Sequence, residues 1–442
     1  MISITLNNIY TLGVIAIAAL MSGQVMAGSN SFVMQPGISH VLKYNVPEVQ
    51  DSIHIYKSAE DGISFDYYLG RVGKQNLQYL ADRLNVDIAE AEIVAAKVLP
   101  DPSLDFEGSK ETYTLGISYT LELGKRYART KLARAESEMQ KLNFLGAYQE
   151  LRAQAAELFL DAILQKELLD VKRTSYEYME KFSQSDSLRF RTGEITENDA
   201  RQSHLEAVSL LNDVFEQEAA YRSSLVELNR FMGVDSDSLQ SPSGNWEMLE
   251  RDFNLPDLLE SGMLNRVDIS AAAQNVEVNR RVYKLERAER RPDLDLSLSY
   301  EREWHYFAPE ARFATVGVSV PLGFSLTNRG ALRSAKFKIE QTQYQQKDVQ
   351  LQVKSEIRQA WFNFESARKK VQQYKSGVLD DARKVMEGMV FSYQRGDSSV
   401  LDVLISQRSY NEVCQDYLET MKGYVSSLVQ LEKSCGIWDI HF

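Results

Sequence analysis

The chain contains few of the residues that interrupt helices, form disulfides or hold metals. It has 9 prolines and 23 glycines in 442 residues, which favours long uninterrupted helices. Its two cysteines, Cys414 and Cys435, fall in one helical stretch and would lie about 32 Å apart at 1.5 Å per residue, too far for an intrachain disulfide. The five histidines are scattered, and no glycine-rich phosphate loop is present. We therefore predict no enzyme activity, no metal site and no cofactor.

The sequence also lacks a hydrophobic run long enough for a membrane helix. The apolar stretch at residues 9–21 has 13 residues, whereas a spanning helix needs about 20. The small-residue segment Val25-Met26-Ala27 follows it and is typical of a signal-peptide cleavage site, although no Lys or Arg precedes Lys43. We predict a signal peptide over residues 1–27, with a buried helix of the mature protein as the alternative. The net charge of −12 disfavours nucleic acid as a partner.

The two halves of the chain align with each other, which indicates an internal duplication. The second half carries 11 extra residues between positions 296 and 317, and we expect a loop there because loops tolerate insertions. More than a hundred residues then align without a gap, which predicts helices of fixed length. Matched positions are Asn85 with Asn275 and Pro102 with Pro292 at an offset of 190, and Arg126 with Arg329 and Gly233 with Gly436 at an offset of 203.

Both halves contain segments in which apolar and polar residues alternate. The alternation covers residues 112–123, 294–301 and 314–320 and has the period of a strand with one apolar face. We predict a hairpin of strands near 10 residues in each half, a length that crosses an outer membrane at a tilt. From the alternation alone, a soluble sheet with one buried face fits equally well.

Helical periodicity follows each hairpin. Apolar residues from Val353 to Met389 recur almost entirely at steps of three and four, which predicts a coiled-coil seam. The matching stretch, residues 126–190, contains no proline and would reach about 97 Å as one helix. Gly193 and Gly396 end these stretches, where glycine suits a helix C-cap.

The predicted layout is helix, hairpin, very long helix, tight turn and returning helix, twice over. Thr196 and Ser399 can N-cap the two returning helices. Four strands cannot close a barrel, since outer-membrane barrels need at least eight, and lipid does not tolerate an open strand edge. Other copies of the chain must therefore complete the sheet if it lies in a membrane.

This layout resembles the TolC-type outer membrane efflux protein family over nearly all of the mature chain. The most specific marks are the two hairpin turns, Phe190-x-x-Gly193-x-x-Thr196-x-x-Asp199 and Tyr393-x-x-Gly396-x-x-Ser399-x-x-Asp402. The resemblance implies an α+β membrane protein with long α-helical coiled-coil hairpins and four transmembrane β-strands per chain. It also implies a homotrimer that forms a 12-stranded β-barrel in outer-membrane lipid and an α-helical barrel in the periplasm.

The implied function is that of an outer membrane channel subunit of a tripartite efflux pump. Such a subunit conducts small-molecule or ion cargo from an inner-membrane transporter and a periplasmic adaptor protein to the exterior. A conduit for type I protein secretion is the alternative. A soluble periplasmic coiled-coil scaffold would explain the helices but neither the signal peptide nor the hairpins.

The resemblance also assigns roles to residues at the two turns. Asp402 matches an aspartate that lines the periplasmic gate, while a second family aspartate is replaced by Ile405. Asp199 and Tyr393 match positions that latch the gate, and Ser398 replaces the arginine of that latch. The positions expected to contact the adaptor are Arg191, Gly193, Thr196, Arg395, Gly396 and Ser399.

The expected division of the chain follows from the duplication. It comprises the signal peptide (1–27), an N-terminal periplasmic segment (28–61), the first repeat (62–233), an equatorial linker (234–251), the second repeat (252–436) and a C-terminal tail (437–442). One basic stretch stands out just before a predicted strand, formed by Arg281, Arg287, Arg290 and Arg291. A solvated helix face explains it most simply; binding to lipopolysaccharide phosphates or to the pump is the alternative.

Overall fold

A computed structural model describes residues 62–235, 239–244, 251–305, 308–321 and 328–439. These residues all belong to one compact unit that spans Lys57–Phe442. The predicted signal peptide and N-terminal periplasmic segment lie outside the described residues, as do parts of the predicted linker and tail.

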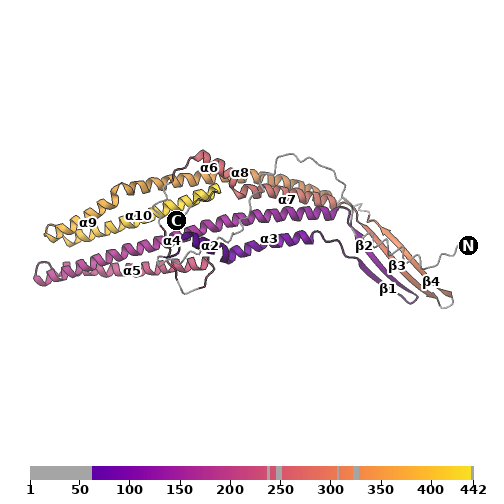
Figure 1. Cartoon of the computed structure of the whole chain (residues 1–442), viewed down its shortest axis with the longest axis horizontal. Helices are drawn as coiled ribbons and strands as arrows, with labels where there is room; N and C mark the ends of the chain where they lie inside the picture. The colour runs from indigo at the N-terminus through magenta and orange to yellow at the C-terminus, as the bar shows by residue number, and fades with distance from the viewer. Residues whose placement is uncertain (1–61, 236–238, 245–250, 306–307, 322–327, 440–442) are drawn as a thin grey trace. The chain divides into compact units, whose positions relative to one another are not determined.

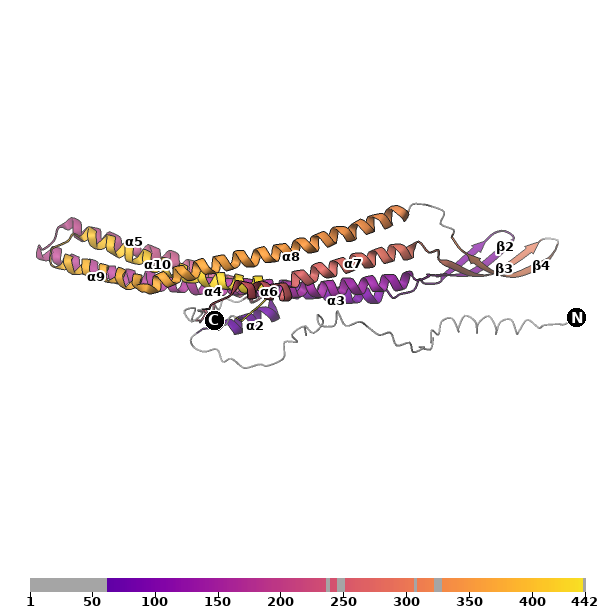
Figure 2. The same ribbon diagram turned by 90° about the horizontal axis from the view of Figure 1, so that it is seen from above.

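The described unit contains two similar series of elements (Figures 1 and 2). The first is α2 (Phe65–Gln75), α3 (Leu77–Ala95), β1 (Ser103–Gly108), β2 (Thr112–Leu121), α4 (Lys125–Thr192) and α5 (Glu197–Phe231). The second is α6 (Leu255–Asn265), α7 (Val267–Glu289), β3 (Leu294–His305), β4 (Ala308–Ser319), α8 (Asn328–Gln373), the π-helical segment η2 (Tyr374–Val378), α9 (Leu379–Gln394) and α10 (Val400–Cys435). Within this unit the strands lie at one end of the helices, and the α4–α5 and α9–α10 turns lie at the other.

The duplication predicted from the sequence is confirmed by the element order. Helices α6 and α7 begin 190 residues after α2 and α3, which is the offset found in the sequence. Gly233 and Gly436 follow the two returning helices, each with a positive φ. Gly233 lies against the backbone of Gln75, the last residue of α2, and Gly436 against that of Asn265, the last residue of α6. The same close contact therefore joins corresponding helix ends in both repeats.

The very long helix is confirmed in the first repeat but not in the second. Helix α4 runs without a break for 68 residues, about 102 Å at 1.5 Å per residue. Its counterpart is divided at η2 into α8 and α9, because Gly377 has φ 113° and leaves the helical conformation. Only glycine adopts this φ readily, so the apolar seam continues in sequence while the backbone kinks.

The four strands form one antiparallel sheet in the order β1-β2-β3-β4. The alternation places the apolar residues on one face, since Ile117 pairs with Leu298 and Leu298 with Val316. Two sequence-based expectations were wrong. Strand β1 has 6 residues rather than about 10, and the 11 extra residues of the second half lengthen β3 and β4 to 12 residues each instead of forming a loop.

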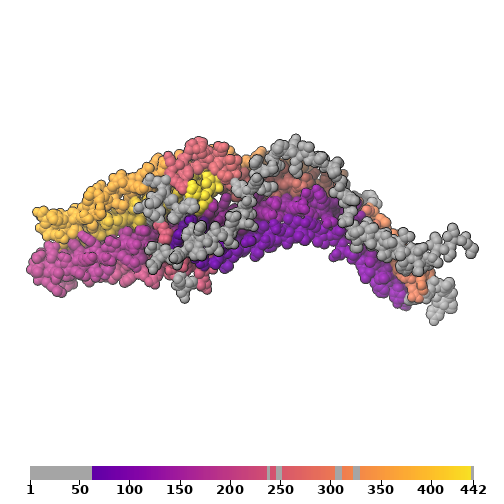
Figure 3. All heavy atoms as spheres, viewed as in Figure 1, coloured from indigo at the N-terminus to yellow at the C-terminus, as the bar shows by residue number. Residues whose placement is uncertain are grey.

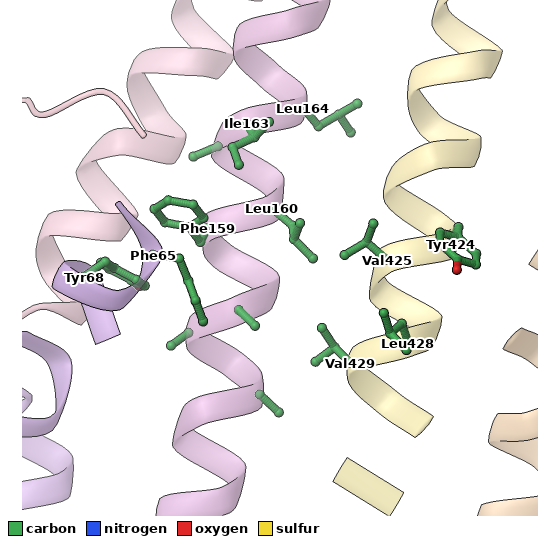
Figure 4. Close-up of a cluster of buried hydrophobic side chains, with 14 of the residues drawn as sticks. Phe65, Tyr68, Phe159, Leu160, Ile163, Leu164, Tyr424, Val425, Leu428 and Val429 are labelled. Atoms are coloured by element: carbon green, nitrogen blue, oxygen red, sulfur yellow. The ribbon is translucent and has the colours of Figure 1, made fainter. Parts of the chain in front are cut away.

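The largest core lies where the short helices meet the long ones (Figure 4). Phe65 and Tyr68 of α2 pack on Phe159 of α4, with ring centroids 5.3 and 5.6 Å apart from that of Phe159. Alanines along α4, including Ala156, are fully buried and let neighbouring helices approach closely. The space-filling view shows α3 and α4 packed side by side towards the strands (Figure 3).

Cys414 and Cys435 both lie in α10 and both are free thiols. None of the helices in the described ranges is both long and apolar enough to cross a bilayer.

The contact at Gly233 yields a prediction about stability. A Cβ at Gly233 would lie 2.1 Å from the Gln75 carbonyl oxygen, whereas a Cβ at Gly193 would have no heavy atom within 4 Å. Both glycines have positive φ, so backbone strain should lower the free energy of unfolding of each alanine variant by about 1 kcal/mol. In Gly233→Ala the free energy of unfolding should fall by about a further 1–3 kcal/mol, because the backbone must move to relieve the overlap between the new Cβ and the Gln75 carbonyl oxygen. Thermal melting followed by circular dichroism tests this, and equal melting temperatures for the two variants would contradict it.

Candidate functional site

The two hairpin tips have the same local structure. Gly193 and Gly396 have φ of 79° and 81°, as a left-handed C-cap requires. The amide after each glycine donates a hydrogen bond to a carbonyl in the last turn of the preceding helix. Glu194 N donates to Arg189 O at 2.8 Å, and Asp397 N donates to Ser392 O at 2.9 Å. The prediction that glycine ends both long helices is confirmed, and both turns expose their backbone.

The returning helices begin with matching capping boxes. The Thr196 side chain accepts from Asp199 N, and the Asp199 carboxylate accepts from Thr196 N. Ser399 and Asp402 make the same reciprocal pair, with Ser399 N donating to Asp402 Oδ2 at 2.9 Å. Hydrogen bonds from the Ser399 side chain and backbone lower the pKa of Asp402. Within one chain, therefore, both predicted gate aspartates cap helices.

A small apolar core joins the two hairpins within about four turns of their tips. Its members come from α4, α5, α9 and α10, so the α4–α5 and α9–α10 hairpins pack together within one chain. The buried residues are Met179, Phe182, Ala207, Leu210, Tyr393, Val400, Val403 and Leu404. Beside this core, Arg408 Nε donates to Glu206 Oε1 at 2.9 Å and ties α10 to α5.

A buried carboxylate also contributes to this contact between the two hairpins. Tyr393 Oη donates to Asp186 Oδ1 at 3.0 Å, which links α9 to α4. The Arg189 guanidinium lies 4.9 Å from the centroid of the Tyr393 ring, and its Nη1 lies 4.0 Å from Asp186 Oδ1. The Phe182 ring also packs on the Tyr393 ring, with their centroids 5.4 Å apart. An aromatic ring, an arginine and an acid thus connect the two hairpins at one point.

Burial governs the titration of this cluster. Only 1% of the Asp186 side chain is exposed. Burial raises the pKa of Asp186 above its ordinary 3.8, although the Tyr393 hydrogen bond and the Arg189 charge oppose that rise. Burial and the neighbouring Asp186 carboxylate likewise raise the pKa of Tyr393.

The structure brings together only part of the site predicted from the sequence. Tyr393 bonds to Asp186, whereas Asp199 is engaged with Thr196. Sequence reasoning missed Asp186 and Arg189. A signal was present, because Asp186 continues the spacing of Met179 and Phe182 and so places a carboxylate in an apolar seam.

The tip residues expected to contact an adaptor are mostly exposed. Arg191, Gly193, Arg395 and Gly396 are exposed at the turns, and the Arg395 guanidinium lies 5.4 Å from the centroid of the Phe391 ring. Ile405, which replaces an aspartate of the family pattern, is 57% exposed. An exposed isoleucine one turn after Asp402 leaves a single acidic position on this part of α10.

The second candidate surface is the sheet. Its apolar face is largely open, with Val316 77% exposed and Val318 64% exposed. The opposite face carries polar residues such as Asp105 and Asp295. Among the described strands, the outer edges of β1 and β4 have no hydrogen-bonded neighbour. The described residues contain no group of three or more His, Cys, Asp or Glu side chains able to hold a metal ion.

The Asp186 cluster predicts a defined pH dependence. The folded-state pKa of Asp186 is raised, so its protonated form favours folding, and that contribution is lost as pH rises from about 3.8 through the raised pKa. Asp186→Asn keeps an acceptor for Tyr393 and does not titrate. The stability of this variant relative to the wild type should therefore increase with pH across that window and then stay constant. Thermal melting across a pH series measures it; a difference that is flat or decreases with pH would be inconsistent with a raised pKa.

Comparisons with known proteins agree on the fold. The family model for outer membrane efflux proteins matches residues 258–437, which covers the second repeat. No curated protein matches the sequence. The structure resembles the CmeC outer membrane channel of Campylobacter jejuni, with a TM-score of 0.70 and 13% identity over 92% of this chain and 94% of that chain.

Two further solved structures share this architecture. The outer membrane protein VceC of Vibrio cholerae has a TM-score of 0.66 and 15% identity over 84% of this chain and 96% of its own. The open state of the MtrE outer membrane channel of Neisseria gonorrhoeae has a TM-score of 0.67 and 16% identity over 85% and 90%. Such identities show a shared fold. Residues 258–437 thus belong to the outer membrane efflux protein family, and both repeats share the fold of the solved outer-membrane channels.

Proposed function

We propose that the chain is one third of a trimeric outer-membrane conduit for small molecules or ions. The single observation that carries this proposal is the sheet, which has one apolar face, one polar face and two unpaired edges. Apolar-out and polar-in alternation is the pattern of a strand between lipid and a water-filled lumen. Three copies supply 12 strands, above the minimum of eight for a closed outer-membrane barrel.

The helices form the periplasmic part of this conduit. Helix α4, at about 102 Å, is several times longer than a bilayer is thick and therefore extends well beyond the membrane. The buried hydrogen bond between Tyr393 and Asp186 and the apolar core beside it hold the two hairpins of one chain together. An inner-membrane transporter and a periplasmic adaptor would meet the conduit at these tips.

Membrane fractionation with N-terminal sequencing tests the proposal directly. The mature chain should begin near Gly28 and be recovered in the outer membrane as a trimer. The export signal predicted at residues 1–27 and the apolar sheet face both motivate this expectation. A cytoplasmic chain that retains Met1 would rule the proposal out.

Asp402 provides a test of the gate. Three copies around a threefold axis would form an acidic ring that attracts cations. Asp402→Asn should therefore lower cation preference in planar-bilayer conductance and weaken block by multivalent cations. Since Ile405 replaces a second acid, that block should already be weaker than in a channel with two acidic rings.

The capping box supplies the control for this experiment. Ser399→Ala removes the side-chain partner of Asp402 but keeps the carboxylate, and should cost about 1 kcal/mol of stability without altering ion selectivity. Unchanged selectivity in Asp402→Asn, with the trimer intact, would leave Asp402 as a helix cap only.

The tip glycine tests adaptor contact. A β-branched side chain strongly resists the positive φ of Gly396, so Gly396→Val should distort the turn. Trimer assembly should persist, because a Cβ at this position would have no heavy atom within 4 Å. Cross-linking to the adaptor and export should be lost. Gly388→Ala, in the body of α9 with equally open space, should keep both activities; normal detergent resistance in Gly396→Val would refute the role of the tip.

A further inference from the structure

Positive charge collects where three helices meet the strands. Residues 125–134 of α4, 280–291 at the end of α7 and 328–338 of α8 together contain 15 Lys and Arg but only 2 Asp and Glu. The whole chain carries a net charge of −12, so the rest of the chain is strongly acidic. We call these three segments the basic collar.

The three segments lie side by side at one level of the fold. Helix α7 packs against both α4 and α8. Lys125 pairs with Asp293 at 2.6 Å, and a Cβ at Gly124 would lie 3.0 Å from Arg291 Nη1, which places the start of α4 beside the end of α7. In Figures 1 and 2, all three segments lie at the end of the helices that is nearest the strands.

Most of this charge is not neutralised within the chain. Lys125 and Arg129 have acidic partners in Asp293 and Glu122, and Arg280 and Arg281 share Glu277. No ion pair joins the remaining collar cations to any acidic residue of the described segments. The exposed cations without such a pair include Arg126, Arg287, Arg290, Arg291, Arg329 and Arg333.

Helix electrostatics does not account for the placement. Arg290 and Arg291 follow the C-terminus of α7, where the helix dipole favours cations. Arg126 and Arg329, however, lie in the first turns of α4 and α8, where the dipole disfavours them, and neither first turn contains an acidic residue. A negative charge from outside the chain would offset both unfavourable arrangements.

Aromatic side chains accompany these cations at the same level. Tyr127 is 69% exposed, and the ammonium of Lys131 lies 5.5 Å from its ring centroid. Phe337 is 53% exposed, and Arg333 lies 5.5 Å from its ring centroid. Exposed aromatic rings beside long cationic side chains are typical of the interface between hydrocarbon and headgroups.

We infer that the basic collar binds the phosphate headgroups of anionic phospholipids in the leaflet at the helical end of the strands. The inference rests on the proposed function, because it requires the sheet to lie in the membrane. The collar lies at the helical end of the strands, which is where the headgroups of that leaflet lie when the strands span the membrane. Guanidinium groups bind phosphate oxygens with two parallel hydrogen bonds, and the collar contains chiefly arginine. A solvated face would not need aromatic side chains, nor cations at two helix N-termini.

Native mass spectrometry of the full mature protein in a neutral detergent can test the collar. The probes are palmitoyl-oleoyl-phosphatidylglycerol and the matching phosphatidylcholine, added at equal concentrations in low salt. The collar variant combines Arg290→Gln, Arg329→Gln and Arg333→Gln. The control variant combines Lys181→Gln, Arg358→Gln and Lys369→Gln, which are also exposed, have no ion pair among the described residues and lie far from the strands.

The wild type and the control variant should both retain phosphatidylglycerol in preference to phosphatidylcholine. That preference should fall by about fivefold for each collar charge removed, because each Lys or Arg near an anionic surface changes binding by about this factor. An equal preference in the collar and control variants would overturn the inference. So would unchanged lipid binding accompanied by loss of adaptor cross-linking, which would assign the collar to a protein partner.

Fractionation of the same cells separates this inference from the proposed function. If the wild type is in the outer membrane and the collar variant keeps its lipid preference, only the collar inference is wrong. If the wild type is not in a membrane, the proposed function is wrong, and the inference is wrong with it.

Discussion

A four-stranded sheet with two unpaired edges cannot lie alone in lipid, because no water is present there to bond its free N–H and C=O groups. The sheet of this chain also leaves its apolar face open, and no described helix packs across it. Both features are unfavourable for an isolated chain in water and favourable for a strand segment of a shared barrel. The proposed dependence on other copies therefore rests on backbone hydrogen bonding. In the proposed trimer, the rest of the fold would hold three such sheets at one height.

The length of the helices fixes where the strands lie relative to the Gly233 and Gly436 contacts. The two repeats align without a gap from Arg126 to Gly233, and Gly233 and Gly436 each contact the end of a short helix so closely that a Cβ would overlap it. An inserted residue in α4 or α8 would shift the strands relative to these contacts. The strands have no such constraint, because they extend from their anchored ends towards the hairpin turns. This difference explains why the extra residues of the second half lengthen β3 and β4 while the helices keep their register.

Much of this was predictable from residue patterns. Period-two alternation identified the sheet faces, and glycine followed by a capping residue identified both tips, since Gly193 and Gly396 need a positive φ that few other residues adopt. The kink at Gly377 was not predictable, because the apolar seam continues through it in the same steps of three and four. The partner of Tyr393 was also missed: only packing brings Asp186 of α4 to α9, 207 residues away in sequence. The collar was seen only in part, since its three segments are far apart in the chain and the fold brings them together.

Closing three sheets into one barrel requires the free edge of β1 in one chain to pair with the free edge of β4 in the next, and this pairing is the central claim. Disulfide trapping in isolated outer membranes tests it most directly, using one cysteine among residues 103–108 and one among residues 311–319 of the same chain. The native Cys414 and Cys435 lie in α10, away from the strands, and can remain. The account predicts β1–β4 cross-links between chains, with products that end at three chains and no larger species. Cross-links only between like strands, or none in a chain that is inserted in the membrane, would contradict it.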